Sequence, residues 1–215
     1  MMTKSFKDLT SDQLARFTAT CQHFGIDPGS VPAQVDTAKV KDGVLCGHPS
    51  GSAEFPVSKI HDVNTIAELN ALGGCKDDSY TKGVASDSFV SYPPSAASLG
   101  LPSLAACGGD VCKLKDSMTL DQHEAVAKAM NAYLMGNSAK VSDYEEHINA
   151  IHFPMQVVSH AAQNIVIGPN NPLIINNPSG APTNVVAGTI TVQRGGYILV
   201  KTPLSMNSQI FTVQK

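Results

Sequence analysis

Acidic residues stop at Glu146 and do not occur again in the chain. The remaining 69 positions, 147–215, hold only three charged side chains, whereas all 18 carboxylates precede them. A surface this poor in charge must offer water amide and hydroxyl groups, unless another part of the protein covers it. The boundary therefore constrains the fold of the last third of the chain and what lies against it. The three charged residues are Arg194, Lys201 and Lys215.

The same boundary separates helical sequence patterns from β-type patterns. Beyond it, short runs rich in β-branched residues alternate with turns of Gly, Pro and Asn, and no internal repeat typical of a solenoid is found. The clearest pattern predicts a hairpin in which Thr189–Gln193 and Tyr197–Val200 flank an Arg-Gly-Gly turn. We therefore predict a C-terminal antiparallel β sandwich, jelly-roll-like or barrel-like. Strands are expected at 156–159, 164–167, 173–175, 185–192, 197–201 and 209–213.

Helical periodicity dominates two stretches before the boundary. Capping-box patterns at Thr10–Gln13, Thr119–Gln122 and Ser142–Glu145 each open a predicted helix, and the last two helices form a helical hairpin. A short helix is expected over 65–72, and strands over 40–45, 55–60 and 88–92. The predicted class is α+β. A helical and irregular region spans 1–152, and an antiparallel β module spans 153–215, the two packed as one compact unit.

Composition narrows the classes of partner. The formal net charge of −3 and the scattered basic residues argue against nucleic acid, which requires a basic surface. No apolar run approaches the roughly 20 residues of a membrane span, and the first residues lack the apolar run of a signal peptide. These features indicate a cytoplasmic protein, with a dedicated export route as the alternative. Five cysteines agree with a reducing compartment, although Cys107 and Cys112 would close a small disulfide loop in an exported protein.

Histidines supply the candidates for acid–base catalysis in a hydrolase or lyase: His123, His147, His152 and His160. In one arrangement His123, His152 and His160 would bind zinc together with Asp121 or Glu124. No metalloprotease-type spacing supports this site. The favoured interpretation is a set of ordinary surface or half-buried histidines.

Cysteines provide a second, weaker set of metal ligands. Cys107 and Cys112 form one close pair, and Cys46, His48 and Cys75 would have to complete a structural zinc site. Cys107 also lies in a Gly-rich loop ahead of a helix, which is the only indication of a nucleophilic thiol. Unpaired or buried thiols are favoured, so no cofactor is predicted. Serine-hydrolase, phosphate-loop and dinucleotide-binding motifs are absent from the sequence.

The uncharged β segment carries the functional hypothesis. Burial between subunits would explain its composition, so we expect a homo-oligomer and a non-enzymatic binding or self-assembly protein. The metal-dependent or His-dependent enzyme is one alternative. A carbohydrate-binding module is another, because the Asn-rich turns could bind a neutral small molecule or glycan. The candidate ligand-binding residues are Asn170, Asn171, Asn176, Asn177 and Arg194.

Overall fold

The computed structural model describes residues 4–39, 45–47, 50, 55–77 and 90–215. Most of the predicted strand at 40–45 and the candidate ligand His48 therefore lie outside the described residues. Of the predicted strand at 88–92, residues 90–92 are described and form no strand. The chain forms two compact units. The β unit contains residues 1–62 and 156–215, and the helical unit contains residues 63–155. The α+β class is confirmed. The sequence groups residues 1–62 with the helical region, whereas in the structure they pack with the C-terminal strands.

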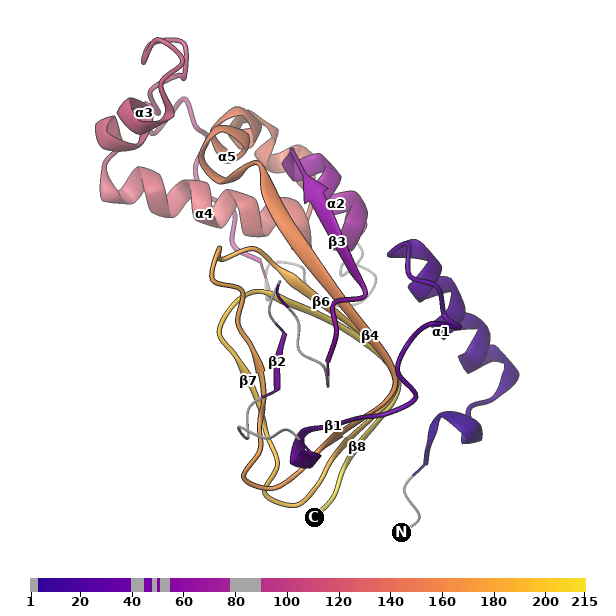
Figure 1. The fold of residues 1–215 in the computed structure, drawn as a ribbon. Helices are drawn as coiled ribbons and strands as arrows, with labels where there is room; N and C mark the ends of the chain where they lie inside the picture. Colours follow the sequence, from indigo (N-terminus) through magenta and orange to yellow (C-terminus); the bar gives the residue numbers. More distant parts are fainter. Residues whose placement is uncertain (1–3, 40–44, 48–49, 51–54, 78–89) are drawn as a thin grey trace. The chain divides into compact units, whose positions relative to one another are not determined.

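The β unit contains two sheets, and apart from β3 and β4, which share one sheet, successive strands of the chain belong alternately to one and to the other (Figure 1). Neighbouring strands along each sheet order pair in parallel, and β3 pairs with β4 beside this path. From β4 onward the chain passes to the other sheet after every strand and then returns, so it winds as a parallel β-solenoid. The first sheet has the order β1 (Val35–Asp36), β4 (Met155–Ile167), β6 (Thr183–Val192) and β8 (Leu204–Val213), with β3 (Lys59–Val63) beside β4; the second has β2 (Leu45–Gly47), β5 (Leu173–Ile175) and β7 (Ile198–Val200).

The predicted antiparallel sandwich and its hairpin are wrong. β6 pairs with β4 and β8, whereas β7 pairs with β5 in the other sheet. The Arg-Gly-Gly turn is therefore a corner between sheets. Gly195 has a φ of 80°, and a Cβ on Gly196 would lie 2.6 Å from the carbonyl oxygen of Ile167. Glycine is required at this corner because another coil passes so closely.

The backbone of the β unit repeats coil by coil, although the sequence contains no internal repeat typical of a solenoid. Val158 pairs with Thr183, 25 residues later in the chain, and Leu173 pairs with Ile198 at the same separation. The long strands also bend together at a common corner (Figure 1). At this corner one position in each strand is left out of the β4–β6 pairing: Ala162 pairs with Ala187, and the next pair is Asn164 with Thr189. Each long strand thus covers two sides of a coil, and β5 or β7 covers a third.

Inward-facing aliphatic side chains of successive coils form one core. Parallel strands buried on both faces are typically rich in such residues, and every residue of β6 is buried. A core of this kind is stabilised mainly by contact between adjacent coils. Its members are Val35, Phe55, Ala162, Ile165, Ile167, Leu173, Ile175, Val185, Ala187, Ile190 and Val192.

The N-terminal helix covers the outer face of the first sheet. Helix α1 (Ser11–His23) packs against β6 and β8, and the short 3-10 helix η1 (Phe6–Asp8) precedes it. The Phe6 ring lies edge-on to Phe17, with ring centroids 5.1 Å apart. A Cβ on Gly188 would overlap the Phe6 ring, so glycine permits this close contact. Part of the uncharged sheet is therefore covered by the same chain.

The helical unit is an insertion between β3 and β4, and Gln156 Nε2 donates to Asp62 Oδ1 at 2.9 Å where the chain leaves and rejoins the β unit. None of the helices in the described ranges combines the length and apolar character needed to cross a bilayer. The inserted helices are α2 (Ile66–Gly73), α3 (Val111–Ser117), α4 (Leu120–Met135), η4 (Ser138–Tyr144) and α5 (Glu145–His152).

Two of the three predicted capping boxes are confirmed, at Thr10 and Thr119. The third is wrong, because the 3-10 helix η4 runs directly into α5 and the Ser142 hydroxyl donates to the carbonyl of Ala139. Helix α3 was not predicted. The Asp110 side chain caps it by accepting from two backbone N–H groups, which a search for capping boxes alone overlooks.

Substituting Asn164→Ala should destabilise the β unit. Asn164 Oδ1 accepts from the backbone N–H of Phe6 at 2.7 Å and from the Thr189 hydroxyl at 2.9 Å, and its amide donates to a backbone carbonyl. Removing this side chain leaves part-buried polar groups without partners, so the free energy of unfolding should fall by about 1–3 kcal/mol. Urea denaturation measures the change. The exposed Asn207→Ala in β8 is the control, and an equal effect of both substitutions would contradict this role.

Candidate functional site

Two candidate catalytic histidines serve structural contacts in the helical unit. His123 in α4 is half-buried, and its Nε2 lies 3.1 Å from the carbonyl oxygen of Lys115. His147 in α5 is buried, and its Nε2 lies 2.9 Å from the carbonyl oxygen of Pro102. Since a carbonyl only accepts, each Nε2 carries the hydrogen. The hydrogen bond of His123 thus joins α4 to α3, and that of His147 joins α5 to the loop before α3.

The other two histidines lie in different units of the chain. His152 ends α5, and partial desolvation and Lys115 lower its pKa. His160 is 0% exposed in β4, stacks on Phe55 with centroids 4.4 Å apart and bonds through Nδ1 to the carbonyl of Pro56. Within the described ranges no three His, Cys, Asp or Glu side chains gather closely enough to hold a metal ion. The zinc site therefore stays a prediction.

The candidate cysteines lie close in sequence but form no disulfide. Cys107 is half-buried, and its Sγ lies 3.8 Å from the hydroxyl oxygen of Ser117. Cys112 is exposed in the first turn of α3. No histidine contact to either thiol is observed among the described interactions, so the arrangement offers no base for a thiol nucleophile.

The Asn-rich turns are corners of the solenoid. Asn170 and Asn171 lie between β4 and β5, and Arg194 lies at the matching corner of the next coil. Asn176 and Asn177 lie at another corner, between β5 and β6. Asn177 is 1% exposed, and its Oδ1 accepts from both the N–H and the hydroxyl of Ser179. Its amide therefore stabilises its own turn, and the five predicted ligand-binding residues are divided between two types of corner.

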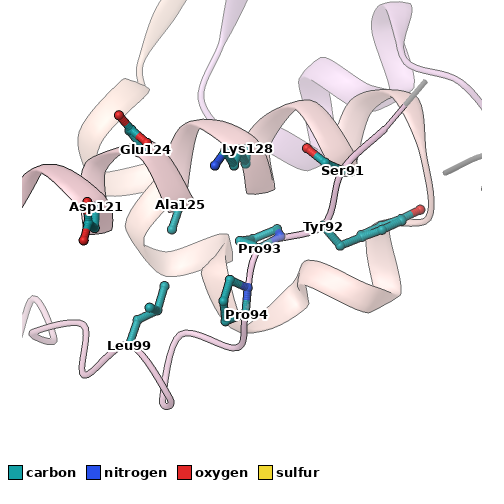
Figure 2. A pocket seen from close by; sticks show the side chains of 9 residues that line it. All are labelled: Ser91, Tyr92, Pro93, Pro94, Leu99, Asp121, Glu124, Ala125 and Lys128. Atoms are coloured by element: carbon teal, nitrogen blue, oxygen red, sulfur yellow. The ribbon is translucent and has the colours of Figure 1, made fainter. Parts of the chain in front are cut away.

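A cavity of about 310 Å³ lies on the helical unit, between α4 and the segment before α3 (Figure 2). The Tyr92 hydroxyl accepts from the N–H of Asn137, and Lys140 Nζ lies 4.7 Å from the Tyr92 ring centroid, so this rim is held in place. Asp121 and Glu124 point in different directions from α4. These two carboxylates therefore do not converge on one point of the cavity. Its lining residues are Ser91, Tyr92, Pro93, Pro94, Leu99, Asp121, Glu124, Ala125 and Lys128.

The strongest candidate site is the last coil of the solenoid, formed by β7 and β8, because several of its inward-facing apolar side chains are exposed. Others, Ile198, Leu204 and Met206, are partly buried against the core. Phe211 pairs with Ile190 of the preceding coil, and Val213 pairs with Val192. Ile190 is 0% exposed, whereas Phe211 is 51% and Val213 is 63% exposed. Val200 in β7 is likewise 49% exposed. We call this surface, formed by Val200, Phe211 and Val213, the open end.

The open end also has unpaired backbone edges and positive charge beside it. β7 and β8 are each the last strand in their sheet order, so within the described ranges one backbone edge of each has no strand partner. Such edges are templates for pairing. Lys201 and Lys215 are exposed beside these strands, and acidic residues are absent from this part of the sequence. The open end thus combines apolar side chains, unpaired backbone and positive charge.

The opposite end of the core is covered. Val35 of β1 is 1% exposed and Phe55 is 0% exposed, and both belong to the same core. Among the described residues, the two ends therefore differ, and the exposed core positions belong to the C-terminal end. Sequence reasoning missed the open end because it depends on which strands pair. No protein-family model, curated protein or solved structure matches this chain.

His61 in β3 should make the β unit less stable at acidic pH. Its ring is half-buried, and the centroids of the His61 and Phe24 rings are 6.3 Å apart. Its Nε2 has no hydrogen-bond partner among the described residues. Burial lowers the pKa of His61, and the positive charges of Lys59 and His23 lower it further. The unfolded chain therefore takes up a proton at a higher pH than the folded chain does.

The free energy of unfolding should consequently fall as the pH drops below about 6.5, the usual histidine pKa, and level off below the lowered pKa. Urea denaturation between pH 5 and 8 measures this, at roughly 1.4 kcal/mol for each unit of pKa difference, less for a partly exposed ring. His61→Asn should reduce the dependence, and His152, whose pKa is also lowered, should supply the part that remains. His123→Asn is the control, and an unchanged slope in His61→Asn would contradict the assignment.

Proposed function

We propose that this chain is a non-enzymatic binding or self-assembly protein, in which the uncharged C-terminal β module joins another polypeptide, foremost a second copy, at its open end. The observation that carries the proposal is the exposure of Phe211 and Val213 at positions where the preceding coil has fully or almost fully buried side chains. Solenoid coils need a neighbour or a polar cap to cover their apolar faces.

Association would bury surface that is costly to leave in water. Complete burial of a Val or Phe side chain contributes about 1.5–3 kcal/mol, and roughly half of that gain is still open for Phe211 and Val213. The free backbone edges of β7 and β8 would add hydrogen bonds to a partner strand. Apolar contact and strand pairing therefore favour binding at the same place.

The enzyme and the carbohydrate-binding module receive less support. Ring nitrogens of His123 and His147 are bonded to backbone carbonyls, and the candidate histidines are divided between the two units. The amide oxygen of Asn177 is bonded within its own turn. These groups would have to exchange structural contacts for ligand contacts, whereas the open end can bind without such losses.

Removing the apolar side chains of the open end should abolish self-association. Sedimentation velocity across micromolar concentrations should show the wild-type chain associating and Phe211→Ser/Val213→Ser sedimenting as a monomer. The matched control is Leu14→Ser, which removes another exposed apolar side chain, 44% exposed on α1. Circular dichroism confirms that each variant is folded. A wild-type chain that stays monomeric throughout would exclude self-assembly.

A further inference from the structure

Leu120 is the most exposed of the large apolar side chains in the described ranges. It is the first residue of α4 and is 73% exposed. The hydroxyl of Thr119 caps this helix, and the buried face of α4 begins at Ala125, so neither the cap nor the packing of α4 accounts for a leucine here. A large apolar side chain held on the first turn of a well-capped helix is available to a partner.

Acidic groups lie around Leu120. Asp121 follows it, and Glu124 lies four residues on, which places Glu124 on the same face of α4 as Leu120. Asp116 lies at the end of α3, immediately before α4, and all three carboxylates are exposed. The exposed basic groups nearby are Lys115 and, one further turn along α4, Lys128. We call Leu120, Asp121 and Glu124 the acidic knob.

The acidic knob and the open end have complementary chemistry. The open end is apolar at its centre, has Lys201 and Lys215 beside it and has no acidic residue in its strands. The net charges of the two units also have opposite signs. The β unit contains nine basic and seven acidic residues, a net charge of +2, whereas the helical unit contains six basic and eleven acidic residues, a net charge of −5.

We propose that the acidic knob of one copy docks on the open end of a second copy, with Leu120 against Phe211 and Val213 and the carboxylates near Lys201 and Lys215. This rests on the proposed self-assembly and names the surface that covers the open end. Two open ends meeting each other would instead bring four lysines together without an acidic partner. The contact joins different surfaces, so copies assemble head to tail, as a closed ring or as an open chain.

Mixing two defective variants tests this geometry. Leu120→Ser retains an intact open end, and Phe211→Ser/Val213→Ser retains an intact knob. Each variant alone should associate at least about tenfold more weakly than wild type in sedimentation velocity. Their equimolar mixture should form a complex of one copy of each and nothing larger. Met135→Ser, which removes another exposed apolar side chain of the helical unit, is the control and should assemble as wild type.

Charge reversal tests the electrostatic part. Lys201→Glu/Lys215→Glu should weaken association, and adding Asp121→Lys/Glu124→Lys to the same chain should restore it, while Glu146→Lys alone should change nothing. Association of the wild type should also weaken as salt is raised. If the wild type self-associates but Leu120→Ser does so equally well, the docking proposal is overturned and the proposed function stands. A wild type that remains monomeric overturns both.

Discussion

Parallel pairing between successive coils is the constraint on which the rest of the β unit depends. It places Ile165, Ile190 and Phe211 in one line along the solenoid, so that each apolar side chain is covered by the next. Cohesion in such an arrangement comes from neighbouring coils rather than from one closed core. A terminal coil that has no cap therefore leaves inward-facing side chains exposed, as β7 and β8 do at Val200, Phe211 and Val213.

The scarcity of charge after Glu146 follows in part from how these strands are buried. β6 is buried on both faces, and a charged side chain there would lose its hydration without gaining a partner. Uncharged polar groups can be satisfied locally, as Asn184 shows by donating to the Ser159 hydroxyl at 3.2 Å. The outer face is covered in part by α1, whereas the open end has no such cover. The low charge of this segment thus agrees both with the core inside the coils and with the cover that α1 gives to the outer face.

Local signals in the sequence predicted local structure well. The capping boxes at Thr10 and Thr119 located two helices, because a cap is formed by residues three apart. Most of the strands were also located, but their pairing was not. Between the last coils, pairing joins residues 25 positions apart in β4–β6 and 21 apart in β6–β8. One line of paired positions contains His160, Val185 and Met206, a polar ring followed by two apolar side chains, so no repeated residue type marks the register.

The candidate site was hidden for the same reason. Phe211 and Val213 look like ordinary strand residues until the register shows that they face inward at the end of the core. Histidines and cysteines attract notice because their side chains can perform chemistry, yet His147 and His123 bond to backbone carbonyls. Exposure of a residue that should be buried is a property of the assembled coil, and no motif encodes it.

The hydrogen bond between Gln156 and Asp62 has a consequence for how the chain is organised. It marks two positions, far apart in sequence, that are neighbours in the β unit, and everything between them is a single excursion of the chain. A scaffold whose excursion begins and ends at one point does not depend on what the excursion contains, because only the spacing of its two ends must be kept. The β unit therefore has the layout of a host, with the helical unit inserted between two positions that are adjacent in space.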